Sequence, residues 1–196
     1  MKKILVILGH PRVKSYCGAL ADAYIKGAKL NKAIVKYVKL IDLKFDATGA
    51  YDSRGAPALE SDLQKMQKLI LWADHLVFVY PTWWGGPPAL LNGFLDRVLT
   101  SGFAFRYRRG GWGWHRYLKG RSARLITTTG GPWALNHIIY RVPGIKMIQW
   151  AALWFVGISP TRVTEITSLN TPLTPHHKKV KWILKAERAG NRDARR

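Results

Sequence analysis

The sequence is poor in cysteine and in acidic residues. Its 196 residues include one cysteine, Cys17, and 11 Asp and Glu against 32 Lys and Arg. One cysteine excludes a disulfide or a thiolate metal cluster within the chain, so we expect no metal site and a reducing, cytoplasmic compartment. The shortage of acid leaves a formal net charge of +21, which favours anionic partners: nucleotide phosphates, nucleic acid or an acidic membrane surface.

Export signals and long hydrophobic runs are also absent. The apolar run near the start ends at Gly9 without an export-type cleavage site. The most apolar late stretch, residues 145–158, is interrupted by Lys146 and Gln149 and is too short to span a bilayer, so we expect a buried helix or an interface segment there. Because 47% of the residues are hydrophobic, we expect one packed domain over residues 1–196.

Strand-like and helix-like patterns alternate along the chain. Apolar, β-branched runs predict strands over residues 3–8, 34–40, 75–80, 124–129 and 162–166. Helical spacing predicts helices over residues 15–30, 60–72, 87–99, 137–150 (interrupted at Pro143 and Gly144) and 175–189, and residues 43–57 have the composition of a loop. This alternation predicts an α/β fold: a doubly wound, five-stranded parallel sheet of order 2-1-3-4-5 with helices on both faces.

That strand order brings the loops after the first, third and fourth strands to one edge of the sheet, where ligands bind. The first loop runs into a helix N-terminus, which favours phosphate, and its candidate cofactor-binding residues are His10, Arg12, Ser15, Tyr16 and Cys17. It is neither a P-loop nor a G-x-G-x-x-G motif. Taken alone, a plain strand-to-helix turn capped by Ser15 explains it better.

The second and third loops combine aromatic, glycine and hydroxyl residues. Their candidate cofactor-binding residues are Pro81, Thr82, Trp83, Trp84 and Gly85, and then Thr128, Thr129, Gly130 and Gly131. Tryptophans can stack on a planar ligand and glycines let backbone N–H groups approach it, although core packing explains either tryptophan about as well. One loop suits a phosphate and two suit a flat heterocycle, and a flavin nucleotide has both parts.

At these residues the sequence resembles the flavodoxin-like NAD(P)H:quinone oxidoreductases, the family of DT-diaphorase and of the bacterial modulator-of-drug-activity B type. The matching pieces, in family order over about residues 3–135, are Gly9-His10-Pro11 with Ser15, residues 81–85, Pro88-Ala89, Asp96-Arg97-Val98, residues 102–105, Leu118-Lys119-Gly120 and residues 128–131. The resemblance implies a flavodoxin-like fold, a non-covalent flavin, homodimers with an active site at each subunit interface, and ping-pong two-electron transfer.

The resemblance also implies residue roles. It places His10 and Ser15 at the flavin phosphates, Trp83, Trp84 and Gly85 along the isoalloxazine, and three residues at its polar edge: Thr128, Gly130 and Gly131. Two departures stand out. Cys17 replaces the family's usual asparagine, and the Tyr and His that assist hydride transfer have no match, with Asn136 where the Tyr would fall and His137 nearby but unaligned. Because the flavin carries the hydride chemistry, activity does not require a side-chain acid, and no catalytic side chain is assigned.

The segment between Phe105 and Leu118 is basic, aromatic and glycine-rich, and it lies in a stretch without acid between Asp96 and Glu165. As a flap over the flavin it would attract the phosphates of NAD(P)H, its arginines favouring NADPH. The candidate substrate-binding residues are then Tyr107, Trp112, Trp114 and, from the third loop, Trp133. An exposed loop that happens to be basic explains the segment equally well. Its aromatics would also suit single-stranded nucleic acid, but without any nucleic-acid motif we expect no such partner.

Two functions of different classes fit these observations. The first is a flavin-dependent oxidoreductase that passes a hydride from NAD(P)H to a quinone-like substrate. We expect FMN rather than FAD, because the chain has little room for an adenine-covering extension. The second is a regulatory or ancillary subunit of the same fold that binds a protein partner, such as a membrane transporter, with little or no turnover. Its support is the basic surface, the apolar stretch 150–158 and the missing Tyr and His. The basic tail, residues 178–196, stays unexplained, and association with a membrane surface through basic patches is compatible with it.

Overall fold

A parallel five-stranded sheet forms the centre of the computed structural model, which describes residues 1–12, 14–48, 58–169 and 174–195. Its strands are β1 (Lys3–Leu8), β2 (Ile34–Lys39), β3 (His75–Pro81), β6 (Ser122–Thr128) and β7 (Thr161–Ile166), in the order β2-β1-β3-β6-β7. The numbers 4 and 5 belong to a separate antiparallel hairpin, β4 (Phe105–Tyr107) and β5 (Trp114–Arg116). Along the chain, β6 and β7 are the fourth and fifth strands of the central sheet, so the predicted order 2-1-3-4-5 of a flavodoxin-like sheet is confirmed.

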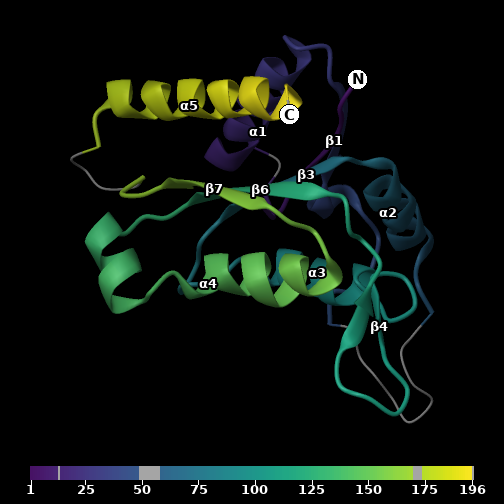
Figure 1. The fold of residues 1–196 in the computed structure, drawn as a ribbon. Coiled ribbons are helices and arrows are strands. Elements are labelled where there is room, and N and C mark those ends of the chain that lie inside the picture. The colour runs from purple at the N-terminus through teal and green to yellow at the C-terminus, as the bar shows by residue number, and fades with distance from the viewer. Residues whose placement is uncertain (13, 49–57, 170–173, 196) are drawn as a thin grey trace.

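Helices cover both faces of the sheet (Figure 1). One face carries α1 (Tyr16–Lys29) and α5 (His176–Ala194), and the other carries α2 (Ser61–Trp72), α3 (Ala89–Val98), α4 (Pro143–Lys146) and the π-helix η3 (Met147–Trp154). A 3-10 turn, η1 (Leu40–Asp42), follows β2, and a π-helical turn, η2 (Leu135–Ile139), follows β6. In the described part of the chain, no helix is both long enough and apolar enough to cross a lipid bilayer.

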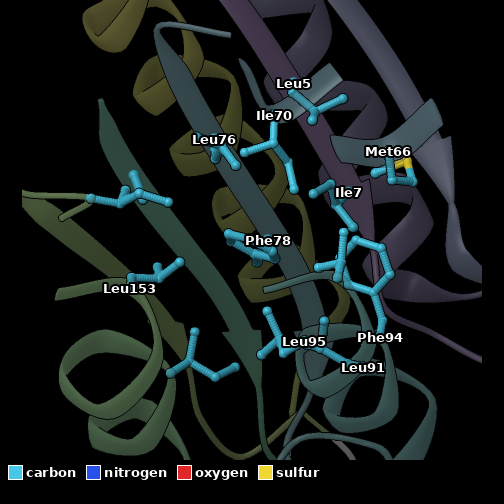
Figure 2. Close-up of a cluster of buried hydrophobic side chains, with 14 of the residues drawn as sticks. Leu5, Ile7, Met66, Ile70, Leu76, Phe78, Leu91, Phe94, Leu95 and Leu153 are labelled. Carbon is cyan, nitrogen blue, oxygen red and sulfur yellow. The ribbon is translucent and has the colours of Figure 1, made fainter. Parts of the chain in front are cut away.

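The central strands are buried on both faces. In β1, Leu5 and Ile7 pack toward α2 and α3, whereas Ile4, Val6 and Leu8 pack toward α1 and α5. Figure 2 shows the first of these clusters. Because both faces of such a strand need apolar side chains, its sequence is a continuous hydrophobic run rather than an alternating one.

Helices α1 and α5 approach each other through two glycines. A Cβ atom on Gly27 would lie 1.9 Å from the carbonyl oxygen of Glu187, and one on Gly190 would lie 2.0 Å from that of Tyr24. Neither position leaves room for a side chain, so the two backbones touch. Beside this contact, the carboxylate of Asp193 in α5 accepts hydrogen bonds from the Tyr24 hydroxyl (2.9 Å) and from two nitrogens of Arg124 in β6 (2.5 and 2.9 Å). These contacts fix α5 along the sheet.

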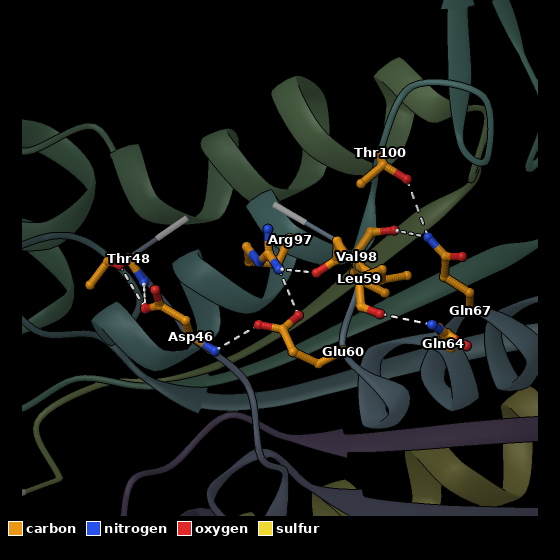
Figure 3. A network of polar contacts seen from close by, with 10 residues as sticks. Asp46, Thr48, Leu59, Glu60, Gln64, Gln67, Arg97, Val98 and Thr100 are labelled. Carbon is orange, nitrogen blue, oxygen red and sulfur yellow. Dashed lines mark hydrogen bonds and ion pairs between the residues drawn. The ribbon is translucent and has the colours of Figure 1, made fainter. Parts of the chain in front are cut away.

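A polar network connects α3 to the segments on either side of residues 49–57 (Figure 3). The buried Arg97 donates to Glu60 Oε2 (2.6 Å) and to the carbonyl oxygen of Ala58 (3.2 Å). The other oxygen of Glu60 accepts from the backbone N–H of Asp46 (3.0 Å). Although partial burial opposes ionisation, these hydrogen bonds lower the pKa of Glu60. Arg97, one of the residues that carry the family resemblance, therefore has a structural role.

Three segments differ from the sequence predictions. The segment between Phe105 and Leu118, for which no strand was predicted, contains the β4–β5 hairpin. The predicted helix over 137–150 is divided into η2, α4 and η3, because Arg141 and Val142 both adopt left-handed backbone conformations and Pro143 then starts a new helix. Helix α5 continues to Ala194, beyond the expected end at residue 189, since its last turns hold Gly190 and Asp193 in the contacts with α1 and β6. Of the predicted loop 43–57, residues 43–48 contain no helix or strand, and the others lie outside the described residues.

Candidate active site

The loops after β1, β3 and β6 lie together at the carboxyl edge of the sheet, as the strand order predicts. Backbone hydrogen bonds connect them and β7: the N–H of Gly9 donates to Val79 (2.8 Å), that of Thr82 to Thr128 (2.6 Å), and that of Thr129 to Ile166 (2.8 Å). The hydroxyls of Thr82 and Thr127 lie 2.7 Å apart. The structure therefore brings together the three loops on which the predicted cofactor-binding residues lie.

The first loop presents a neutral histidine and a helix start. His10 is only 4% exposed, and its Nδ1 accepts the N–H of Arg12 (3.0 Å). Burial and the charge of Arg12 both lower the pKa of His10, so its ring stays neutral and can accept that bond. Ser15 is the N-cap of α1, and its Oγ accepts the N–H of Gly18 (3.1 Å). Arg12 is exposed, which leaves its positive charge beside the amino end of the helix.

Tyr16 and Cys17 have their side chains engaged within the protein. The Tyr16 hydroxyl donates to the carbonyl oxygen of Lys179 in α5 (2.7 Å), and burial raises the pKa of Tyr16 to about 12. Cys17 is 2% exposed and lies 3.5 Å from the hydroxyl of Thr128, and burial raises the pKa of its thiol to about 11. Because these side chains are engaged, Tyr16 and Cys17 can bind a ligand only through their backbone N–H groups, which lie in the first turn of α1.

The second loop displays Trp84 to solvent on a tight turn. Trp83 and Gly86 exchange two backbone hydrogen bonds (2.8 and 2.9 Å), and the residues between them, Trp84 and Gly85, both have positive φ angles of 51° and 76°. Glycine adopts this conformation freely, but tryptophan does so only at a cost. Trp84 is fully exposed, so core packing does not explain it, and Trp83 is half-exposed with its ring edge-on to His10 (5.8 Å between centroids). A strained, exposed aromatic residue is typical of a binding site.

The third loop is supported by Glu165 at the end of β7. Trp133, half-exposed, stacks on His137 with ring centroids 4.5 Å apart, and His137 Nε2 lies 2.5 Å from Glu165 Oε2. The side-chain amide of Asn136 donates to the other oxygen of the same carboxylate. Sequence reasoning missed Glu165, although one signal was available: it is the first acid after the acid-free stretch that starts beyond Asp96.

Two adjoining hollows lie between the second and third loops. The first has a volume of about 190 Å³, and its lining residues come from both loops and from η2 and the residue after it: Thr82, Trp84, Gly85, Thr129, Gly131, Leu135, Asn136 and Tyr140. The second, of about 230 Å³, shares Trp84, Gly85 and Tyr140 with the first and adds Pro143. The loop and α4 are held together here, because the N–H of Gly144 donates to the carbonyl oxygen of Gly85 (2.8 Å).

The hairpin residues predicted to bind substrate lie elsewhere in the chain. The β4–β5 hairpin leads into the amino end of β6, at the opposite end of the sheet from the three loops (Figure 1). Trp114 stacks on Phe155 (4.5 Å) and donates its Nε1–H to that residue's carbonyl oxygen (2.7 Å). Tyr107 and Trp112 are exposed. Within one chain, Trp133 is therefore the one predicted substrate-binding residue that lies with the loops.

A larger hollow, of about 630 Å³, was not foreseen from the sequence. It lies between the segment after β7 and the first turns of α5, with Thr167, His177, Lys178 and Trp182 among its lining residues. The Tyr16 hydroxyl reaches α5 in the same region, at Lys179. Among the described residues, no group of three or more His, Cys, Asp or Glu side chains is arranged to hold a metal ion.

Comparison with known proteins identifies the family. A family model described as having a flavodoxin-like fold matches residues 2–186. The chain belongs to this family, within which it is similar to the flavin-dependent NAD(P)H quinone reductases at about 30% identity, as its loop residues predicted.

Individual relatives support the same assignment. Mouse (Mus musculus) ribosyldihydronicotinamide dehydrogenase (quinone) is 31% identical over 150 residues, which are 66% of this chain and 64% of that protein, so the chain spans less than two thirds of its relative's length. The crystal structure of Smu.1420 from Streptococcus mutans UA159 superimposes with a TM-score of 0.82 at 29% identity, covering 97% of this chain and 99% of that one. An FMN-dependent NADH-azoreductase from Bacillus anthracis, solved in complex with FMN, has a TM-score of 0.75 at 20% identity, covers 99% of this chain and 100% of that one, and shares the fold.

Proposed function

We propose that the chain binds a flavin nucleotide at the carboxyl edge of its sheet and transfers a hydride from NAD(P)H to a quinone-like acceptor. The observation that carries this proposal is Trp84, held in a strained turn, fully exposed, and lining a hollow shared by the second and third loops. A flat heterocycle covering this indole would offset the cost of its exposure and strain. The names of the relatives, which are quinone and azo reductases, support the same reaction class.

The residues present fit such a cofactor. The exposed guanidinium of Arg12 and the first backbone N–H groups of α1 are suited to a phosphate. His10 stabilises this loop, because its Nδ1 accepts the backbone N–H of Arg12. The glycine backbone at Gly130 and Gly131 can approach the polar edge of a ring. We propose FMN as the cofactor, as in the Bacillus anthracis relative, with FAD as the alternative.

Bound flavin would supply the hydride chemistry, and the protein supplies orientation and electrostatics. Backbone N–H groups of the third loop would stabilise negative charge at the ring edge, as preorganised donors do. Trp84 and Tyr140 would keep water from the ring face. Glu165 holds Asn136 and His137, and through His137 the Trp133 ring, in place beside the hollow.

We also propose that the active site is completed by a second copy of the chain. Trp84 lines both adjoining hollows, of about 190 and 230 Å³, and its side chain is fully exposed, so one chain would leave part of a flavin uncovered. The hairpin carries the exposed Tyr107 and Trp112 far from its own loops, which leaves them available to a partner's site. A groove of about 860 Å³ between α3 and η3 is suited to the contact between the two copies, because its lining combines apolar side chains such as Leu95 and Met147 with polar ones such as Asn92.

The test is direct. Any chromophore bound to the purified protein is released by heat and identified by mass spectrometry. Protein from which the flavin has been removed is then titrated with FMN and with FAD. Trp84→Ala should weaken FMN binding by about tenfold, since one stacking contact contributes about 1–3 kcal/mol. Leu71→Ala, which removes an exposed apolar side chain near the carboxyl end of α2 and away from the three loops, serves as the control and should leave FMN affinity within about twofold. Protein that neither carries nor takes up flavin contradicts the proposal.

The alternative, a regulatory subunit with little turnover, is favoured by one observation. Trp150 and Trp154 of η3 are both substantially exposed, which is typical of a surface that contacts another protein. Steady-state kinetics separates the two functions. Protein that binds flavin but oxidises no NADH or NADPH with a panel of quinones supports the regulatory subunit.

A further inference from the structure

We propose that the outer face of α5 docks on an anionic membrane surface. The outer face is defined here by its six exposed cations: Lys178, Lys181, Lys185, Arg188, Arg192 and, directly after the helix, Arg195. This surface lies on the layer of the molecule formed by α1 and α5, on the opposite side of the sheet from α2, α3 and η3 (Figure 1). The inference rests on α5 alone and does not depend on the proposed enzymatic function.

The charge of this face is positive without compensation from its own helix. The two acids of α5 are both occupied by other cations: Asp193 is buried against Arg124, and Glu187 pairs with Lys26 of α1 (3.1 Å). Across the described residues, no ion pair joins any of the six outer-face cations to a carboxylate. The neighbouring α1 exposes one acid, Asp22, and two lysines, Lys26 and Lys29. The outer face therefore presents only positive charge to an approaching surface.

The cations follow one line along the helix. Lys181, Lys185, Arg188 and Arg192 are spaced at intervals of four, three and four residues, which places them on one stripe of an α-helix. From Lys178 to Arg192 this stripe is about 20 Å long at a rise of about 1.5 Å per residue. Like charges at this spacing repel one another, and an extended anionic surface relieves that repulsion along the whole stripe.

Two aliphatic side chains favour lipid over nucleic acid as the anionic partner. Val180 and Leu184, one turn apart and each 44% exposed, lie along the edge of the cationic stripe. Aliphatic side chains beside lysines can insert between lipid headgroups, as in interfacial amphipathic helices. Proteins that bind nucleic-acid strands without sequence preference instead present aromatic rings for stacking, and α5's one aromatic residue, Trp182, is half-buried.

Docking through this face would cover the hollow of about 630 Å³, which Lys178 and Lys181 line, but it would leave the three loops and the groove accessible. The hollow between the second and third loops is lined by neither α1 nor α5, and the groove between α3 and η3 lies on the other side of the sheet. A membrane-docked chain could therefore still bind a ligand at the loops and a second copy at the groove.

The experiment is co-sedimentation of the full chain with vesicles of equal parts phosphatidylglycerol and phosphatidylcholine, against vesicles of phosphatidylcholine alone. Binding should require the anionic lipid and weaken with added salt. The double variant Lys185→Gln with Arg188→Gln should lower the partition coefficient by about tenfold or more, since each basic residue near such a surface contributes about 1 kcal/mol. The matched control, Lys44→Gln with Lys68→Gln, removes the same charge from exposed positions on the α2 side and should change it by less than about twofold.

A second variant separates lipid from nucleic acid. Val180→Gln with Leu184→Gln keeps the net charge and the helix propensity, and it should weaken vesicle binding severalfold without changing the binding of single-stranded oligonucleotides. Equal losses in the two charge variants would show that overall charge, not this face, drives binding, and would overturn the proposal. So would equal binding to both kinds of vesicle, binding to neither, or oligonucleotide binding tighter than vesicle binding.

Discussion

At the scale of single residues, the least expected feature is the carboxylate of Glu165. It stands at the end of β7 and binds two consecutive side chains of η2, Asn136 and His137, while the ring of His137 stacks on Trp133. Asn136 is nearly buried, so its amide depends on this partner. One acidic side chain thus fixes the third loop, and π-helical turns such as η2 often occur at functional sites.

Glu165→Ala should lower the free energy of unfolding by about 1–3 kcal/mol, because it leaves the buried amide of Asn136 without a partner. It should also weaken FMN binding, since the third loop loses its support. Urea unfolding monitored by circular dichroism and FMN titration measure the two effects. Glu165→Gln, which keeps a hydrogen-bonding oxygen, is the control and should lose less of both. If the alanine variant equals the unchanged protein in both measurements, Glu165 does not support the loop.

At the scale of secondary-structure elements, the contact between α1 and α5 determines where the outer face of α5 lies. Gly27 and Gly190 allow the two helix backbones to touch, each at a position where a Cβ atom would overlap a carbonyl oxygen of the other helix. Glycine inside a helix is unfavourable by about 1 kcal/mol relative to alanine. The close approach outweighs this cost, because the obstructing atoms belong to backbone and cannot rotate away.

Gly190→Ala should therefore destabilise the protein by about 1–3 kcal/mol or more, although alanine is the better helix former. The measurement is the midpoint of urea or thermal unfolding. Gly111→Ala is the matched control, because a Cβ atom there would meet nothing within 4 Å, and it should be close to neutral. A stabilised Gly190→Ala variant would show that α1 and α5 are not in backbone contact.

At the scale of the whole molecule, one buried charge cluster ties four elements together. Asp193 of α5 binds Arg124 of β6 and Tyr24 of α1, and His75 at the start of β3 lies 3.3 Å from the same carboxylate. Although burial opposes ionisation of Asp193, the hydrogen bonds from Arg124 and the nearby ring of His75 hold the pKa of Asp193 well below its usual range. Burial lowers the pKa of His75, and the nearby Asp193 only partly offsets this.

Both shifts make the fold weaker in acid. Below the ordinary histidine value of 6.5, the unfolded chain takes up a proton at His75 that the folded chain does not, so stability falls as the pH drops. Below the ordinary aspartate value of 3.8, protonation of Asp193 in the unfolded chain adds a second loss. Urea unfolding at a series of pH values should show a first decline beginning near pH 6.5. In His75→Gln, which cannot titrate, that first decline should be reduced; an unchanged pH profile would assign the decline to other groups.

The local patterns determined the sheet and its strand order. Runs such as residues 3–8 are apolar at every position, which only a strand covered on both faces requires, and their alternation with helical spacing left the doubly wound parallel sheet as the natural arrangement. The positions of the three loops followed directly, because parallel strands end at the same edge. A single domain over residues 1–196 and a cytoplasmic location stay predictions.

Other features depended on contacts between distant residues. The sequence did not show that Trp84 would be exposed on a left-handed turn, that Tyr16 and Cys17 would turn their side chains inward, or that Glu165 would hold η2. For the last three, the partner lies more than twenty residues away: Lys179 for Tyr16, Thr128 for Cys17, and η2 for Glu165. The hairpin is the clearest case, since its composition was suited to a flap and only its connection to the amino end of β6 places it away from the loops.

The net charge of +21 also separates what the sequence determines from what the fold determines. Sequence alone determined its size and its concentration in the acid-free middle and in the tail, because charge counts need no coordinates. Only the tertiary structure decided which of these charges remain available. Arg97 and Arg124 are buried in ion pairs, whereas the stripe on α5 faces solvent because the two acids of that helix are turned toward α1 and the sheet. The direction in which a side chain points is set by what its helix packs against, and that is a property of the fold.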